Sequence, residues 1–261
     1  MAQFQTLRRN IMKWYKNSAN LRAGFTEKDI DQLENNNTAL HVAKNAKDVL
    51  NNRQTLADEL TIPLAHFVCA NQTHSANVVK VTSALKGRGA FSAEDAIADT
   101  DALYTREKNI VLCTFTADCV PIVFYDPTLS LIGVIHSGWQ GTVKEIARHT
   151  FQTIIKDEGC NPQNLHIHIG AALSQEKFEV DEDVYHKFKT LGYADEWMYF
   201  NPATKKYHID NQQVVKKQCE LTGIPSENIS VDATCTFKSD SGFSYREDRT
   251  CGRHLHFIVQ H

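Results

Sequence analysis

The sequence of 261 residues has few prolines, no CxxC pair and no long apolar run. Its 6 prolines stand singly, and no linker or internal repeat divides the chain, which favours one continuous domain over residues 1–261. No segment approaches the roughly twenty apolar residues that a membrane span requires. Residues 1–18 also lack the apolar core of a secretory signal peptide. We therefore expect a cytoplasmic protein with no membrane partner.

Neither sign of charge dominates, because 28 lysines and arginines stand against 31 aspartates and glutamates, for a net charge of -3. The chain lacks the broad cationic footprint that nucleic acid or an anionic lipid surface demands. We expect a small-molecule substrate and no nucleic-acid partner, and the composition leaves the oligomeric state open.

The 7 cysteines are an odd number without a CxxC pair, which argues against a disulfide framework and against a structural zinc site with several cysteines. We expect reduced thiols. Histidine is abundant, with 12 residues. This abundance favours metal binding or proton transfer, because imidazole binds metals and titrates near neutral pH.

Apolar periodicity predicts helices over 46–60, 142–156 and 210–223. We expect the second helix to begin just after Gly141, because Thr142 and Glu145 have the spacing of a capping box. Strands are predicted over 64–70, 109–115, 121–126, 129–136, 165–170, 228–235 and 254–260. Since strands outnumber helices and only some are separated by one, the pattern favours a mixed α/β fold, with layered sheets flanked by helices in the alpha-beta-beta-alpha manner.

Three candidate metal ligands, His74, Cys119 and His136, each lie beside a turn at the end of a predicted strand. Because functional loops cluster at strand ends, these side chains can converge. Two imidazoles and one thiolate leave the fourth position of a zinc ion open, which is the pattern of catalytic rather than structural zinc. Taken singly, each histidine is equally a hydrogen-bonded core or surface residue, and the cysteine a small buried hydrophobe.

Nearby carboxylates offer support for such ligands. Asp99, Asp101 and Asp118 can accept hydrogen bonds from ligating histidines and so orient them. Asp99 and Asp101 can equally form a turn, and the sequence by itself does not identify a general acid.

Two further features suggest an anion site. Gly138 and Gly141 precede a predicted helix, where backbone N–H groups can approach an anion; alternatively, they only make a tight turn. Arg53 falls in the middle of the apolar face of the helix at 46–60. A buried guanidinium needs a partner, either an internal carboxylate or a bound anion such as phosphate, unless it extends to the solvent.

The segment DSGFSYREDRTCGRH, residues 240–254, is the richest in arginine. Arg246, Arg249 and Arg253 stand there with the aromatic residues Phe243 and Tyr245. Such a loop is either a solvated turn with charge pairs or a surface on which a planar base can stack.

Five segments in order, NQTHSANV, ADTDALYT, TADCVPIVFYD, GVIHSGWQGT and GFSYREDRTCGR, resemble the bacterial polyphenol-oxidase or laccase-domain family. The resemblance extends from about Gly24 to Val259. Members of that family are regarded as zinc-dependent purine nucleoside phosphorylases with adenosine deaminase side activity. The resemblance therefore implies cleavage of adenosine, inosine or guanosine by inorganic phosphate, giving the free purine and ribose 1-phosphate.

The resemblance also implies roles for individual residues. It assigns His74, Cys119 and His136 as zinc ligands, and Cys119 and Arg53 as catalytic residues. The substrate-binding residues that it implies are Arg53, Asn37, Tyr245 and Arg246.

The chain departs from the family pattern at several positions. Ser75 replaces a glycine, while Gln140 and Glu247 each replace an arginine. A missing cation at position 140 would weaken phosphate binding beside the proposed anion site.

Three alternatives stay open. A His₂Cys set is also typical of blue copper, which would make the protein a copper-dependent polyphenol oxidase; however, Met1, Met12 and Met198 all lie far from the ligands in sequence. The second alternative is a metal-free cysteine hydrolase or amidase acting on cell-wall precursors, with Cys119 as nucleophile and His136 as base. The third is a nucleotide sensor without turnover.

Overall fold

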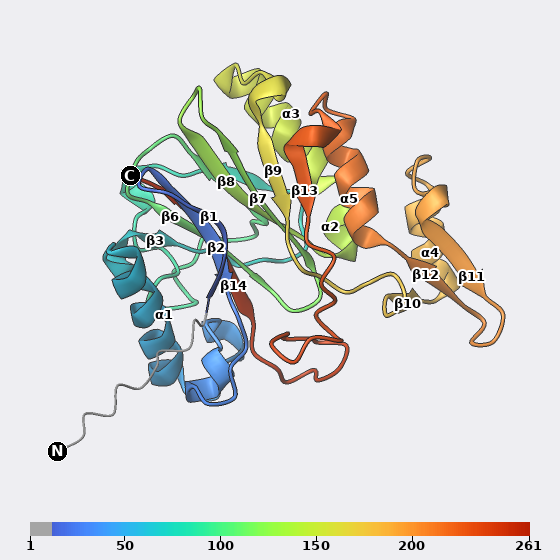
Figure 1. Ribbon diagram of the computed structural model, residues 1–261, viewed down its shortest axis with the longest axis horizontal. Helices are drawn as coiled ribbons and strands as arrows, with labels where there is room; N and C mark the ends of the chain where they lie inside the picture. The colour runs from blue at the N-terminus through green and yellow to red at the C-terminus, as the bar shows by residue number, and fades with distance from the viewer. Residues whose placement is uncertain (1–11) are drawn as a thin grey trace.

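The structure, a computed structural model, describes residues 12–261 (Figure 1). Residues 1–11, where the sequence predicts no signal peptide, lie outside the described residues. The strands are β1 (Met12–Asn17), β2 (Leu21–Thr26), β3 (Phe67–Val68), β4 (Val78–Lys80), β5 (Ala102–Thr105), β6 (Val111–Thr116), β7 (Val120–Asp126), β8 (Leu131–Ser137), β9 (His166–Ile169), β10 (Glu179–Val180), β11 (Met198–Asn201), β12 (Lys206–Ile209), β13 (Ile229–Val231) and β14 (His254–Gln260). The helices are α1 (Ala46–Leu60), α2 (Trp139–Val143), α3 (Ile146–Glu158), α4 (Glu182–Lys189) and α5 (Asn211–Glu220).

Two large sheets form the centre of the fold. One has the strand order β1-β2-β14-β6-β3 and the other β13-β9-β7-β8-β5-β4. They pack face to face through an apolar layer that includes Leu112 and Ile258 of the first sheet and Leu103 and Val123 of the second. Helix α1 covers the outer face of the first sheet, and α3 and α5 cover that of the second (Figure 1). The predicted mixed α/β fold with alpha-beta-beta-alpha layers is confirmed.

Helix α1 has the bounds that the periodicity predicts. It begins where the Asn45 side chain accepts a hydrogen bond from the Lys47 amide, which satisfies one free donor of the first turn. Val49 and Leu56 lie on its buried face, and burying each such side chain stabilises the fold by roughly 1.5–3 kcal/mol. Arg53 lies on the same face, so the helix carries a guanidinium into the interior.

The predicted strand over 64–70 is wrong for most of its length. A 3-10 helix occupies Leu64–His66, and only Phe67 and Val68 pair with β6. From Cys69 onward the backbone bonds to a loop instead, with the Cys69 amide donating to the Arg88 carbonyl. Long-range partners, rather than the local apolar pattern, therefore end this strand.

The predicted helix over 142–156 also begins elsewhere. One short helix, α2, starts at Trp139, and α3 starts at Ile146 after Glu145, which has a left-handed backbone (φ 58°). The capping box does not form, because the Thr142 hydroxyl contacts Ser137 and the Gly138 carbonyl. The Glu145 carboxylate instead accepts hydrogen bonds from Arg148 and from Tyr193.

A small lobe stands beside the second sheet (Figure 1). It combines helix α4 with a three-stranded sheet of order β10-β12-β11. Phe178, Phe188 and Ile209 share its apolar cluster, against which Trp139 of α2 also packs. The sequence predicts none of these elements, because strands of two to four residues with partly exposed side chains leave almost no periodicity. Strands β1, β2, β4 and β5 are likewise found only in the structure.

The sequence predicts reduced cysteines and no membrane-spanning segment, and the structure can be compared with both predictions. All 7 cysteines, each within the described residues, are free of disulfide bonds. Among residues 12–261, every helix is too short or too polar to span a bilayer.

Candidate metal centre and adjoining cavity

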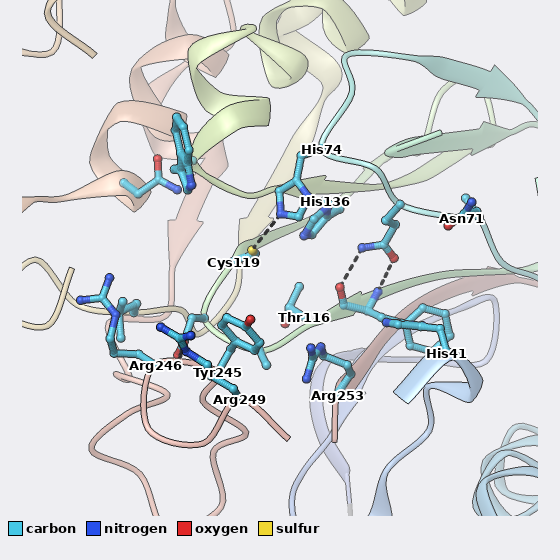
Figure 2. Close-up of a pocket in the computed structure, with 18 of the residues that line it drawn as sticks. His41, Asn71, His74, Thr116, Cys119, His136, Tyr245, Arg246, Arg249 and Arg253 are labelled. Atoms are coloured by element: carbon cyan, nitrogen blue, oxygen red, sulfur yellow. Dashed lines mark hydrogen bonds between the residues drawn. The ribbon is translucent and has the colours of Figure 1, made fainter. Parts of the chain in front are cut away.

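The three predicted metal ligands come together. The ligand atoms of His74, Cys119 and His136 all lie within 4.8 Å of one another (Figure 2). Cys119 Sγ is 3.8 Å from His74 Nε2, and the two imidazole rings are 4.8 Å apart between centroids. Ligand atoms around a tetrahedral zinc ion lie about 3.3–3.8 Å apart, given the usual Zn–N and Zn–S lengths. The donor set and its spacing therefore fit one metal ion.

Sheet pairing explains two of the three positions. Cys119 directly precedes β7, and His136 is the next-to-last residue of β8. These strands are antiparallel neighbours in which Pro121 pairs with His136, so the start of one lies beside the end of the other. His74 comes from the loop between β3 and β4 and has a left-handed backbone (φ 59°).

Gly138 makes room for this group. A Cβ atom at position 138 would lie 2.4 Å from Cδ2 and 2.7 Å from Nε2 of His74, and 3.0 Å from Cys119 Sγ. Real Cβ atoms do not approach other atoms so closely. Gly138, which we assigned to an anion site, therefore leaves the space that the side chains of the candidate metal ligands His74 and Cys119 occupy. Helix α2 has only five residues, so we do not retain its amides as phosphate donors.

Gly138→Ala is expected to displace His74 and to lower metal affinity by roughly 10- to 100-fold, the usual effect of disturbing the surroundings of a ligand. Gly141→Ala is the matched control, because the nearest atom to its added Cβ would be 3.3 Å away, on the Ile146 side chain. Metal content after purification and circular dichroism of both variants measure the effect. Equal metal content in the two variants would contradict this role of Gly138.

Asp101 holds two of the ligands in place. Its Oδ1 atom accepts a hydrogen bond from His136 Nδ1 at 2.7 Å, which leaves His136 Nε2 for a metal. The same carboxylate accepts hydrogen bonds from the amides of His74 and Ser75 and from the Ser75 hydroxyl. Ser75, a departure from the family pattern, thus adds a donor to Asp101. Burial would raise the pKa of Asp101, but the hydrogen bonds and charge of His136 and the Ser75 donors lower it to about 2.

The other two candidate carboxylates have different partners. Asp99 accepts hydrogen bonds from Thr73 and Asn77. Asp118 accepts one from the Thr236 hydroxyl and one from the Arg246 amide, both at 2.7 Å, and so holds the C-terminal loop against the cavity. Of the three predicted orienting carboxylates, Asp101 is the one that contacts a ligand histidine.

Charge coupling favours the thiolate form of Cys119. Burial would raise the pKa of Cys119, but the charge and hydrogen bonds of His136 and His74 lower it to about 6. Conversely, burial would lower the pKa of His136, while Cys119 and Asp101 raise it to about 9. Both shifts favour the thiolate, which is the form that binds metals and attacks electrophiles.

The side chains of His74, Cys119 and His136, here called the metal group, line a cavity of about 720 Å³. Tyr245, Arg246, Arg249 and Arg253 reach it from the C-terminal loop (Figure 2). Phe178 of the small lobe and Trp139 contribute apolar surface. A cavity of this size can hold a nucleoside-sized ligand.

Arg53 lines the same cavity and is only 2% exposed. Its Nε donates to the Thr38 carbonyl at 2.6 Å, and its Nη1 to the carbonyls of Gly89 and Ala90 at 2.7 Å. The guanidinium also lies 5.1 Å above the Phe115 ring. No carboxylate of the described chain forms an ion pair with Arg53, so carbonyl dipoles and the face of the Phe115 ring hold its positive charge.

Of the remaining residues that we predicted to bind substrate, two line the cavity and one does not. Tyr245 and Arg246 line the cavity, where Arg246 Nη1 donates to the carbonyls of Lys177 and Glu179. Asn37 is buried and outside the cavity lining, and its Oδ1 accepts hydrogen bonds from the amides of Ala39 and Arg253. Asn37 thus anchors the chain that carries Arg253, and its contact with substrate stays a prediction.

Several cavity residues had no sequence signal of their own. His41 and Thr116 line the cavity, although the sequence assigned a role to neither of them. Gln140 is exposed and outside the cavity lining, so the arginine missing at this position does not remove a cation from it. Glu247 is likewise outside this cavity and lines a smaller one.

The chain is similar to known proteins over most of its length, including the residues that line the cavity. A family model described as multi-copper polyphenol oxidoreductase laccase matches residues 21–261. Purine nucleoside phosphorylase YlmD of Bacillus subtilis is 38% identical over 257 residues, which cover 95% of this chain and 92% of that protein. Adenosine deaminase RL5, from an unknown prokaryotic organism, is 33% identical over 197 residues, 75% of each chain.

A solved structure is similar as well. The crystal structure of the Bacillus licheniformis hypothetical protein YfiH has a TM-score of 0.92 to this chain, with 34% sequence identity and 98% of both chains covered. The layered sheets and the positions of their connecting loops are therefore shared with this protein.

Proposed function

The chain belongs to the family described as multi-copper polyphenol oxidoreductase laccase, and we propose that it is a zinc-dependent purine nucleoside phosphorylase. Inorganic phosphate would attack the ribose C1′ of adenosine, inosine or guanosine and release the free purine and ribose 1-phosphate. The observation that carries the proposal is one cavity lined both by the His74, Cys119 and His136 group and by the Arg53 guanidinium without a carboxylate partner. Relatives named purine nucleoside phosphorylase support it.

Arginine geometry supports phosphate as one substrate. The guanidinium of Arg53 is held rigidly by three carbonyls, and its Nη2 makes no hydrogen bond with the described residues. Burial, followed by the charges of Arg253 and Arg53, lowers the pKa of His41 to about 4. The part of this shift that the two arginines contribute indicates a positive potential around His41, which favours an anion. Phosphate would therefore bind between Arg53 and the C-terminal loop.

The metal group supplies the second part of the site. His74, Cys119 and His136 would hold zinc, which when bound supplies a fixed positive charge that stabilises negative charge formed in the reaction. Asp101 keeps His136 in the tautomer whose Nε2 faces this group. Among residues 12–261 this is the one cluster of at least three candidate ligands, and no methionine lines the cavity, which favours zinc over copper.

Apolar and aromatic groups support a purine nucleoside as the other substrate. Phe178, Trp139 and Tyr245 give the cavity aromatic surface on which a base can stack. Adenosine deamination belongs to the same proposal: water rather than phosphate is the nucleophile, it attacks C6 of the base, and the C6–N bond breaks to release ammonia. A relative named adenosine deaminase supports this second activity.

One observation favours a second candidate function, a cysteine hydrolase. Asp101, His136 and Cys119 form a chain in which a carboxylate orients an imidazole beside a thiol of lowered pKa. That arrangement matches the pattern of an activated cysteine nucleophile. The third donor, His74 Nε2 at 3.8 Å from the sulfur, has no place in such a triad but completes a metal site.

A single experiment separates these functions. Protein purified without added metal is analysed for zinc and copper, then incubated with adenosine or inosine, with and without phosphate. We expect bound zinc, and ribose 1-phosphate only when phosphate is present. Zinc-loaded protein that forms no ribose 1-phosphate would contradict the proposal. Dye oxidation with bound copper would support the copper oxidase. Alkylation of Cys119 that does not depend on metal would support the cysteine hydrolase. Stoichiometric nucleoside binding without turnover would support the nucleotide sensor.

A further inference from the structure

A chain of hydrogen bonds leads from the cavity into the layer between the two large sheets. Thr116, the last residue of β6, lines the cavity (Figure 2). Its Oγ1 is 2.8 Å from Nε2 of His256 on β14. Nδ1 of His256 is in turn 2.9 Å from the hydroxyl of Tyr15 on β1. Thr116 is 1% exposed and His256 is fully buried. The mechanism proposed above uses none of these three side chains.

Each of the three side chains is uncharged. Burial, followed by the charges of His254 and His168, lowers the pKa of His256 well below its usual value. Burial, followed by the negative charge of Asp232, raises the pKa of Tyr15 well above its usual value. A neutral imidazole has one N–H donor and one acceptor nitrogen. One of the two hydroxyls therefore donates to His256, and the other accepts from it.

Tyr15 is the hydroxyl that donates. Its ring stacks on Phe25, with 5.5 Å between centroids, and lies tilted against the His168 ring, with 3.8 Å between centroids. A Cβ atom added at Gly170 would lie only 2.6 Å from the phenol oxygen, so the backbone closes over it. In the part of the chain that the structure describes, this hydroxyl has no second hydrogen-bond partner. If it accepted from His256, its own hydrogen would be left without a partner in a crowded site, which is unfavourable.

The proton positions along the chain then follow. A phenol is also a stronger hydrogen-bond donor than an aliphatic hydroxyl. Tyr15 O–H donates to Nδ1 of His256, and the proton on Nε2 is donated to Oγ1 of Thr116. The hydroxyl hydrogen of Thr116 is consequently left free, and the cavity is the space that this side chain lines.

We propose that Tyr15 and His256 fix the Thr116 hydroxyl as a hydrogen-bond donor into the cavity, where it binds an acceptor atom of the substrate that carries no hydrogen. Such atoms are a phosphate oxygen and a ring nitrogen of the purine. Thr116 contacts the substrate, while Tyr15 and His256 are positioning residues. The identity of these substrates rests on the proposed function, but the direction of the donor does not.

The first test measures the tautomer of His256. In protein labelled with ¹⁵N-histidine, long-range proton–nitrogen correlation spectra show which ring nitrogen carries hydrogen, and His256→Asn assigns the signal. We expect the proton on Nε2 and a bare Nδ1. A proton on Nδ1 would overturn the proposal, whatever the protein catalyses.

The second test compares Thr116→Val with Thr116→Ser, because valine has nearly the same shape without the hydroxyl and serine retains it. Thr116→Val is expected to weaken the binding of one substrate by about fivefold, the usual effect of losing one hydrogen bond. Calorimetry with inorganic phosphate and with inosine separately identifies which substrate is affected, and the KM values should follow the same division. Tyr15→Phe, which frees the Thr116 hydroxyl to rotate, is expected to weaken the same substrate by a smaller factor.

The outcomes are distinct. A Thr116→Val variant that binds both probes as tightly as Thr116→Ser and wild-type protein would overturn the proposal, with melting temperatures confirming that each variant is folded. A lower kcat with both KM and Kd values unchanged would also overturn it, because that pattern indicates an interaction made only in the transition state and not one that binds the substrate. If wild-type protein forms no ribose 1-phosphate, the proposed function fails, while the tautomer and the calorimetric comparison still decide this inference.

Discussion

Cys119→Ser is expected to lower the rate of phosphorolysis by at least about 10³-fold, which corresponds to about 4 kcal/mol of transition-state stabilisation. Serine cannot supply the thiolate that completes the group with His74 and His136, since its hydroxyl does not ionise near neutral pH. Metal content should fall together with the rate, because we propose that the three side chains share one ion. Elemental analysis and a product assay on the same preparation measure both effects.

Cys251→Ser is the matched control, because Cys251 is partly exposed and lies outside the cavity that holds the metal group. It should retain both metal and activity. Cys119→Ser protein that loses activity but keeps its zinc would indicate a nucleophilic thiol, and so favour the hydrolase. Full activity and full metal content in Cys119→Ser would contradict the site as a whole.

Arg53→Lys is expected to raise the phosphate concentration needed for half-maximal rate by roughly 10- to 100-fold, because hydrogen bonds to charged groups contribute about 1.5–3 kcal/mol. Lysine keeps the positive charge but cannot bind the Thr38, Gly89 and Ala90 carbonyls and a phosphate at the same time. Metal content should not change. Arg53→Ala should likewise change the phosphate requirement much more than the metal content. It also leaves buried carbonyls without donors, so we choose lysine.

Arg22→Lys controls for the loss of a guanidinium elsewhere. Arg22 Nη1 donates to the carbonyls of Glu59 and Leu60 at the end of α1, and Arg22 is not among the cavity residues. Its replacement should leave the phosphate dependence unchanged. A parallel loss of metal and of phosphate affinity in Arg53→Lys would mean that Arg53 is a structural residue.

The candidate metal ligands are recognisable in the sequence because each one stands beside a turn at the end of a predicted strand. Cys119 and His136 stand next to apolar runs that become β7 and β8, and strand ends meet wherever neighbouring strands pair. The motifs shared with the laccase-domain family indicate the same residues. Arg53 is recognisable through periodicity alone, because a charge at a buried helical position interrupts an otherwise regular stripe.

Other expectations failed where a distant segment competes with a local preference. The spacing of Thr142 and Glu145 is that of a capping box, yet Glu145 turns to Tyr193, 48 residues away. The apolar run over 64–70 leaves its sheet because Cys69 bonds to the loop at Arg88. Gly138 has the setting of an anion-binding glycine, but its lack of a side chain serves His74 and Cys119.

The sequence by itself determined the layered fold class, the helix that buries Arg53 and the three residues of the metal group, because these depend on periodicity and on side-chain chemistry. Only the tertiary structure decided what surrounds them: carbonyls rather than a carboxylate at Arg53, Asp101 behind His136, and a lobe that completes the cavity. The hydrogen bond between Thr116 and His256 joins residues 140 positions apart, and that between Tyr15 and His256 joins residues 241 positions apart. Such contacts follow from how sheets pack, and the residues of one strand do not indicate which distant residue that strand will contact.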